Sequence, residues 1–136
     1  EEEGLENVWA RHRALAGAVW AAFDVWSSGS PTIAMNVAKP ENRGWSVTAA
    51  RIGGNDATRL REWCEHEAGV TLGISLGMAA AGDPAWHGFL RVAHMGHVNA
   101  HMTLGVLAVM ETGMQALGIA HGAGGIMAAT KAISAR

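Results

Sequence analysis

The sequence predicts an α+β domain in which a small, mostly antiparallel sheet of about four strands is covered by helices, with a long N-terminal helix. Apolar residues recur with helical spacing near both ends of the chain, and short runs rich in Val, Ile and Ala lie between these stretches. The 136 residues, 49% of them apolar, are enough for one domain with its own core. We therefore treat residues 1–136 as a single unit.

The first helix is expected from Leu5 to Trp26. Its apolar stripe has a spacing of three or four residues and consists of Leu5, Val8, His12, Leu15, Val19, Phe23 and Trp26. Trp9 and Trp20 widen this stripe, so the helix should be buried on two sides, against the sheet and against another domain or subunit. The Ser, Gly and Pro residues of segment 27–31 end it.

Two strands and a helix are expected next. Residues 32–37 and 46–52 form the strands, and the short turn at 39–44 makes them antiparallel. A helix follows over residues 57–68, and the side chain of Asn55 or Asp56 is expected to cap it. Gly69 is expected to end this helix in the left-handed conformation.

The second half of the chain is predicted to contain two more strands and two helices. Residues 70–74 and 88–93 form the strands, separated by a loop of small residues. Helices are expected over residues 99–117, ended by Gly118, and over residues 126–134.

Arg91 is the strongest candidate for function. It lies in the apolar run Phe89-Leu90-Arg91-Val92-Ala93, and a cation in a half-buried strand costs free energy unless an anion meets it. The guanidinium is planar and permanently charged, which suits two-point binding of a carboxylate. An internal ion pair with an acidic residue of the chain would explain the same pattern.

His94, His97 and His101 are spaced by three and four residues, which would align them on one helical face. Three imidazoles could then hold a metal ion. Gly96 interrupts the group, however, so that His94 is expected at the strand end, His97 at the helix cap and His101 within the helix. Local hydrogen bonds near a cleft are the alternative role for these side chains.

Composition argues against several classes of function. The formal net charge is −2 and the ten basic residues form no stripe, so nucleic acid is not an expected partner. No apolar run approaches the length needed to cross a membrane. The single cysteine, Cys64, excludes an internal disulfide, fits a cytoplasmic location and is expected to be a buried, inert thiol.

Three segments resemble one enzyme family. The run Glu3–Arg13, EGLENVWARHR, is similar to the helix that leads out of the large domain in the alanine:glyoxylate and serine:glyoxylate aminotransferases. The run Phe89–Gly96, FLRVAHMG, resembles that family's strand with the substrate-carboxylate arginine, and Gly73–Gly77 resembles its glycine-rich loop. These are class V, fold-type I enzymes that use pyridoxal phosphate.

The resemblance implies that the chain is the C-terminal small domain of such an aminotransferase, which moves an amino group from alanine or serine to glyoxylate or a similar 2-oxo acid as a homodimer. It also implies that the cofactor lysine and most of the phosphate site come from the large domain and the partner subunit. Lys39 and Lys131 match no family motif, so the chain alone is expected to be inactive and to hold no cofactor. The absence of an initiator methionine before Glu1–Glu3 fits a piece of a larger polypeptide.

Only Arg91 takes over a family role, as the group that binds the substrate α-carboxylate. The loop at 78–88 is longer than the family's usual connection, with Asp83–His87 added, which leaves the side-chain specificity open. Two other functions are compatible with the residues. One is a non-catalytic module that binds a small molecule or a metal through Arg91 and the histidines, and the other is a structural or dimerisation domain in which Arg91 pairs with Glu111 or Asp83.

Overall fold

The computed structural model of the chain describes residues 2–135 and confirms the α+β class. Four helices and three strands are present in these residues, together with two short 3-10 turns. In chain order the elements are α1 (Leu5–Ser28), β1 (Ile33–Met35), η1 (Pro40–Asn42), β2 (Val47–Ile52), α2 (Asp56–Ala68), η2 (Pro84–Gly88), β3 (Phe89–Ala93), α3 (Ala100–Leu117) and α4 (Gly125–Ser134).

The sheet has the order β1-β2-β3, and both pairs of neighbouring strands are antiparallel. Ile33 pairs with Ile52 across the first two strands, and Ala49 pairs with Arg91 across the second two. Because successive side chains of a strand point to opposite faces, this register places Arg91 on the face opposite to the buried Leu90 and Val92.

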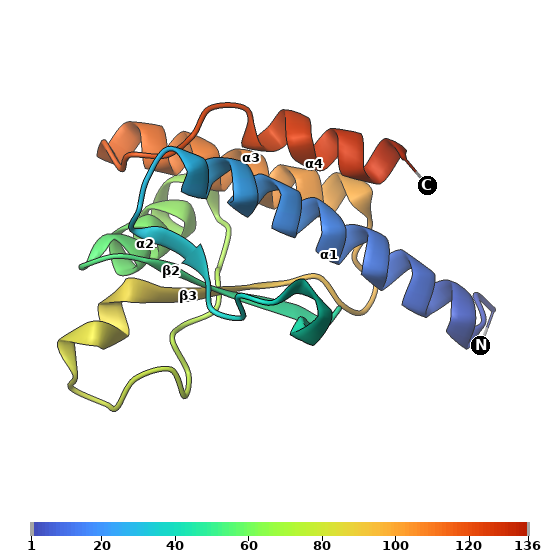
Figure 1. Cartoon of the computed structure of the whole chain (residues 1–136), viewed down its shortest axis with the longest axis horizontal. Coiled ribbons are helices and arrows are strands. Elements are labelled where there is room, and N and C mark those ends of the chain that lie inside the picture. Colours follow the sequence, from blue (N-terminus) through green and yellow to red (C-terminus); the bar gives the residue numbers. More distant parts are fainter. Residues whose placement is uncertain (1, 136) are drawn as a thin grey trace.

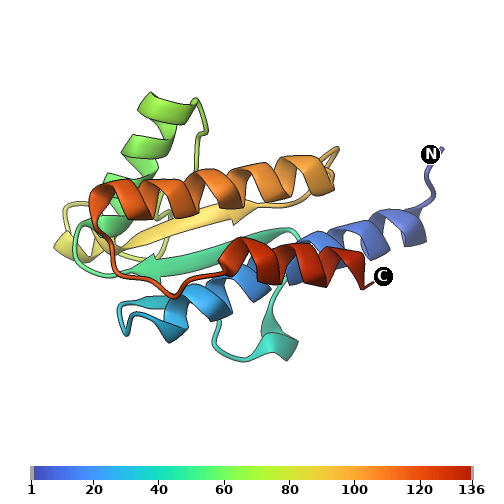
Figure 2. The same ribbon diagram turned by 90° about the horizontal axis from the view of Figure 1, so that it is seen from above.

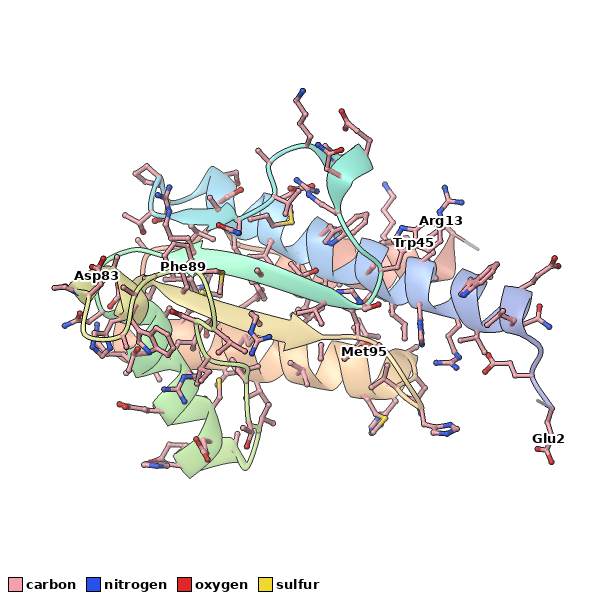
Figure 3. The ribbon with its side chains drawn as sticks, turned by 90° about the horizontal axis from the view of Figure 1, so that it is seen from below. Glu2, Arg13, Trp45, Asp83, Phe89 and Met95 are labelled. Atoms are coloured by element: carbon pink, nitrogen blue, oxygen red, sulfur yellow. The ribbon has the colours of Figure 1, made fainter. Side chains whose placement is uncertain are left out.

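The helices lie on one side of the sheet. Figure 1 shows α1, α3 and α4 above the strands, and in Figure 2, seen from above, α4 lies along α1. The connection from α2 to β3 lies on the other side of the sheet, below the strands in Figure 1. The sheet thus has one face covered by helices, and its other face, which Figure 3 views from below, carries this connection and is otherwise open.

The core lies between the sheet and the helices. The second half of α1 supplies its largest side chains, Phe23 and Trp26, whose rings pack edge to face with centroids 5.0 Å apart. The first half of α1 extends beyond the core, and Leu5 and Trp9 are 62% and 51% exposed. The predicted apolar stripe is therefore buried only from Leu15 onwards, and the described residues provide no second layer over Trp9.

The predicted strand at 70–74 is wrong, so that the sheet has three strands rather than four. Gly73 makes one isolated bridge to Arg91, through two backbone hydrogen bonds of 2.8 and 2.9 Å. Beyond it, the carbonyl of Ile74 accepts hydrogen bonds from Leu76 N and from Arg91 Nε. These local bonds turn the chain away from the edge of β3 and end the ladder after one residue pair.

Three predicted details of the helix and strand ends are also wrong. Asn55 precedes α2 but makes no capping bond, and the carboxylate of Asp56 instead pairs with Arg59 at 2.6 Å. Asn99, rather than His97, caps α3 by accepting a hydrogen bond from Met102 N. Gly88 belongs to η2, because Asp83 accepts a bond from Ala85 N and starts a tight turn there. The predicted left-handed glycines after α2 and α3, Gly69 and Gly118, are confirmed.

Gly122 is expected to be essential for the packing of α4 against α1. A Cβ atom at this position would lie 2.0 Å from Val25 O, and Gly122 N donates a hydrogen bond to Trp26 O. Gly122→Ala should therefore lower the free energy of unfolding by about 1–3 kcal/mol or more. Gly105, inside α3 with open space around its Cα, is the matched control, and Gly105→Ala should raise stability by about 0.5–1 kcal/mol. Urea unfolding of the two variants measures both changes, and equal stabilities would contradict the packing argument.

Candidate functional site

Arg91 occupies the middle of β3 on the open face of the sheet. It is half-buried, and its partner in the register is the small residue Ala49 of β2. A pocket of about 220 Å³ lies beside it, and Thr71, Gly73 and Met95 are among the residues that line this pocket. The predicted candidate residue thus lines a pocket of a size that suits a small ligand.

The segment before the long loop holds the Arg91 side chain in place. Arg91 Nε donates a 2.8 Å hydrogen bond to Ile74 O, and the backbones of Arg91 and Gly73 are bonded in both directions. A Cβ atom on residue 73 would lie only 3.0 Å from the Arg91 Cβ, so this close approach favours glycine. The Nε of the guanidinium is therefore occupied by this anchor. Its two Nη groups remain available to a ligand.

No acidic side chain among residues 2–135 forms an ion pair with Arg91. The two partners considered from the sequence are bonded elsewhere. Glu111 Oε2 accepts a 2.7 Å bond from Trp26 Nε1, and Asp83 accepts from Ala85 N. The hypothesis of an internal Arg91 ion pair with Glu111 or Asp83 is therefore wrong for the described chain.

His94 is a fully buried residue with both ring nitrogens in hydrogen bonds. His94 Nδ1 lies 2.9 Å from Trp45 O, and His94 Nε2 lies 2.9 Å from Thr48 Oγ1, which also accepts a bond from Trp20 Nε1. These partners fit a neutral ring that donates from Nδ1 to the carbonyl and accepts the Thr48 hydroxyl proton at Nε2. Burial lowers the pKa of His94 below its ordinary value, which favours this neutral form.

The three histidines do not converge. His97 and His101 are exposed, whereas His94 points into the core with no free nitrogen. In the part of the chain that the structure describes, no group of three His, Cys, Asp or Glu side chains could hold a metal ion. Local hydrogen bonds were the alternative to metal binding for these three histidines, and His94 makes such bonds.

The start of α1 holds the turn that follows β3, a contact that sequence reasoning missed. Arg11 Nη1 donates to Gly96 O at 2.7 Å and to Val98 O at 2.9 Å, while its other nitrogens bind Glu3. His12 Nε2 accepts a 3.1 Å bond from Gly96 N. The sequence does contain one signal for this contact. His12 lies within the apolar stripe of the helix, and a polar side chain in that position needs a polar partner.

Comparisons with known proteins agree on one type of enzyme. The chain is 32% identical to L-aspartate–glyoxylate aminotransferase from Paracoccus denitrificans over 118 residues, which are 86% of this chain and 27% of that protein. It is 33% identical to serine–glyoxylate aminotransferase from Arabidopsis thaliana over 114 residues, 81% of this chain and 25% of that protein. No protein-family model matches the chain.

Solved structures extend the likeness to the fold. Pyridoxamine–pyruvate aminotransferase from Mesorhizobium loti superposes with a TM-score of 0.82 and 27% identity, over 98% of this chain and 32% of that one. Ureidoglycine–glyoxylate aminotransferase from Bacillus subtilis shares the fold, with a TM-score of 0.80 and 24% identity over the same shares of the two chains. The chain is thus similar in sequence and in fold to one part of these aminotransferases. It spans about a quarter of the length of the curated relatives that it matches.

The described residues do not by themselves fit pyridoxal phosphate. Lys39 lies before η1 and Lys131 lies in α4, both exposed, and neither lines the pocket beside Arg91. Cys64 is buried in α2, as predicted, and burial raises the pKa of its thiol to about 11, which disfavours the reactive thiolate. No helix within residues 2–135 is long and apolar enough to cross a membrane.

His94 is expected to make folding stability fall in mild acid. Because burial holds the folded-state pKa of His94 below the ordinary 6.5, the unfolded chain binds the proton more readily. The stability that this neutral histidine supplies is present above pH 6.5 and is lost as the pH falls below it. His94→Leu should lower the free energy of unfolding at pH 7.5 by about 1–3 kcal/mol, because Thr48 and Trp45 O lose a partner.

Urea unfolding at pH 7.5 and at pH 5.5 tests this prediction. The loss of stability between the two pH values should be smaller in His94→Leu than in the wild type. The control is His101→Gln, a change at an exposed position of α3, which should keep the wild-type pH dependence. A His94→Leu variant with the full wild-type loss would show that other groups cause it.

Proposed function

We propose that this chain is the C-terminal small domain of a pyridoxal-phosphate aminotransferase that transfers an amino group from an amino acid to glyoxylate or a similar 2-oxo acid. The matches to two glyoxylate aminotransferases support this assignment, since each covers most of this chain and a limited part of the relative. The likeness in fold to two further aminotransferases gives the same indication. The rest of the active site would lie in other parts of the enzyme.

The observation that carries the proposal is the state of Arg91. Its Nε is anchored to Ile74 O, no acidic group of residues 2–135 neutralises it, and a pocket lies beside it. An uncompensated guanidinium with two available Nη groups can bind both oxygens of one carboxylate. We assign Arg91 the binding of the α-carboxylate of the amino acid and of the 2-oxo acid, which orients the Cα–H bond for proton removal.

The cofactor would supply the electron sink for that proton removal. The chain's own contribution is binding and orientation. The short β2–β3 ladder and the bonds to Gly73 and Ile74 fix the direction of the arginine fork. The chain alone should therefore bind carboxylates weakly and catalyse no transamination.

Alanine and serine are the amino donors that we propose first, on the resemblance to the alanine:glyoxylate and serine:glyoxylate enzymes. Aspartate is a further donor to test, because one relative is an L-aspartate–glyoxylate aminotransferase. We also propose a homodimeric enzyme in the cytoplasm. The exposed Leu5 and Trp9 of α1 offer apolar surface to such an assembly.

The first test is the visible spectrum of the intact polypeptide that contains this chain, purified with added pyridoxal phosphate. The bound cofactor should absorb in the visible range, and its spectrum should change when alanine, serine or aspartate is added without an acceptor. Addition of glyoxylate should then reverse the change. A colourless protein, or a coloured one that responds to no amino acid, would contradict the proposed function.

Arg91→Ala should reduce kcat/KM for the amino donor and for glyoxylate, by an amount equivalent to about 2–5 kcal/mol of transition-state stabilisation. The kcat/KM of Arg91→Lys should lie between those of the wild type and Arg91→Ala, since an ammonium keeps the charge but lacks the planar, two-point geometry of the guanidinium. Arg51→Ala is the matched control, because Arg51 is an exposed arginine of β2 on the same open face. Steady-state kinetics of the intact enzyme give all these values, and normal turnover by Arg91→Ala would refute the role of this residue.

A further inference from the structure

Met95 is an exposed apolar side chain in the pocket beside Arg91. It is 49% exposed, and among the described residues that line this pocket it is the only large apolar one that is exposed. Figure 3 shows it just beyond the end of β3, where the chain turns towards α3. Contact of such a side chain with water is unfavourable, and a ligand that covered it would remove that cost.

The backbone on both sides of Met95 is held by hydrogen bonds. The ring of His94, the residue directly before it, is bonded through both nitrogens. On the other side, Gly96 O accepts a 2.7 Å bond from Arg11 Nη1, and Gly96 N donates a 3.1 Å bond to His12 Nε2. The backbone of Met95 is therefore fixed relative to the sheet and α1, while its unbranched side chain can adapt to a ligand.

The other residues of the pocket indicate which part of an amino acid would meet Met95. Arg91 is the only charged residue among the described ones that line the pocket, and Thr71 is the only other polar side chain there. A carboxylate in this pocket thus has Arg91 as its partner. The remaining atoms of the ligand lie against a mainly apolar lining, of which Met95 is the large exposed member.

We propose that Met95 determines the substrate specificity of the enzyme by contacting the side chain of the amino donor whose carboxylate Arg91 binds. This inference rests on the proposed function, because it needs Arg91 to hold that carboxylate. It names amino acids with small, uncharged side chains as the substrate class, since the thioether limits the length of the side chain and offers no partner to a second charge. Alanine and serine fit this class, and aspartate does not.

Met95→Ala in the intact, cofactor-loaded enzyme tests the proposal, with glyoxylate as acceptor and two donors that differ by one methylene, alanine and 2-aminobutyrate. Removal of the thioether frees room for the longer side chain, so the ratio of kcat/KM for 2-aminobutyrate to that for alanine should rise about tenfold. Met95→Leu keeps most of the side-chain volume and should retain the wild-type ratio. The kcat/KM for glyoxylate should stay at the wild-type value in both variants, because glyoxylate has no side-chain carbon.

Met102→Ala is the matched control. Met102 is a methionine of α3 with the same 49% exposure, and it does not line the pocket beside Arg91. This variant should keep the wild-type donor ratio. A ratio that rises as much in Met102→Ala as in Met95→Ala would overturn the inference, because the effect would then not depend on the pocket.

Failure of this inference and failure of the proposed function give different results. If Arg91→Ala weakens turnover while Met95→Ala leaves the donor ratio unchanged, the methionine contact is refuted and the arginine assignment stands. A Met95→Ala enzyme with an unchanged ratio and a lower thermal unfolding midpoint would show that Met95 packs against another part of the enzyme, which also overturns the inference. A wild type that uses aspartate as well as alanine would refute the substrate class. If Arg91→Ala has normal kinetics, both proposals are wrong.

Discussion

Trp26 is the side chain on which the arrangement of the helices depends. Its ring is fully buried, Phe23 packs against it edge to face, and its Nε1 donates to Glu111 Oε2 in α3. Its backbone carbonyl accepts from Gly122 N, and a Cβ atom on Gly125 would lie 2.2 Å from the indole nitrogen. One tryptophan of α1 thus contacts α3, the connection between α3 and α4, and the start of α4. The two glycines are required because a larger residue at either position would separate α4 from α1.

The regular elements could be predicted because their signals are local. The apolar spacing of α1, the glycines after α2 and α3, and the short turn between β1 and β2 each involve neighbouring residues. The strand at 70–74 could not be assessed in this way. Its apolar composition suits a strand, but the turn at Ile74 depends on a bond from Arg91, seventeen residues away. Likewise, Asp56 was an apparent cap residue, and its competing partner Arg59 became evident only from the side-chain geometry.

Part of the candidate site could be predicted from the sequence, because one of its signals is also local. A lone arginine in an apolar strand is visible in the sequence, and the strand period places it opposite Leu90 and Val92. Whether it has an internal counterion is a question of three-dimensional distance, and the bonds of Glu111 and Asp83 to other groups answer it. The hydrogen-bonded chain from Trp20 through Thr48 to His94 was missed, because its members come from three separate parts of the sequence.

The two faces of the sheet explain why a cation without an ion-pair partner can persist in so small a domain. The covered face carries apolar side chains, and the polar residues there, Thr48 and His94, satisfy each other. Stability is therefore supplied by the helix side, and the open side is free to hold groups that lower it. Arg91 is half-buried there and has no ion-pair partner among residues 2–135. A carboxylate bound as proposed would supply that counterion, so a group that is unfavourable in the free chain would become favourable in the complex.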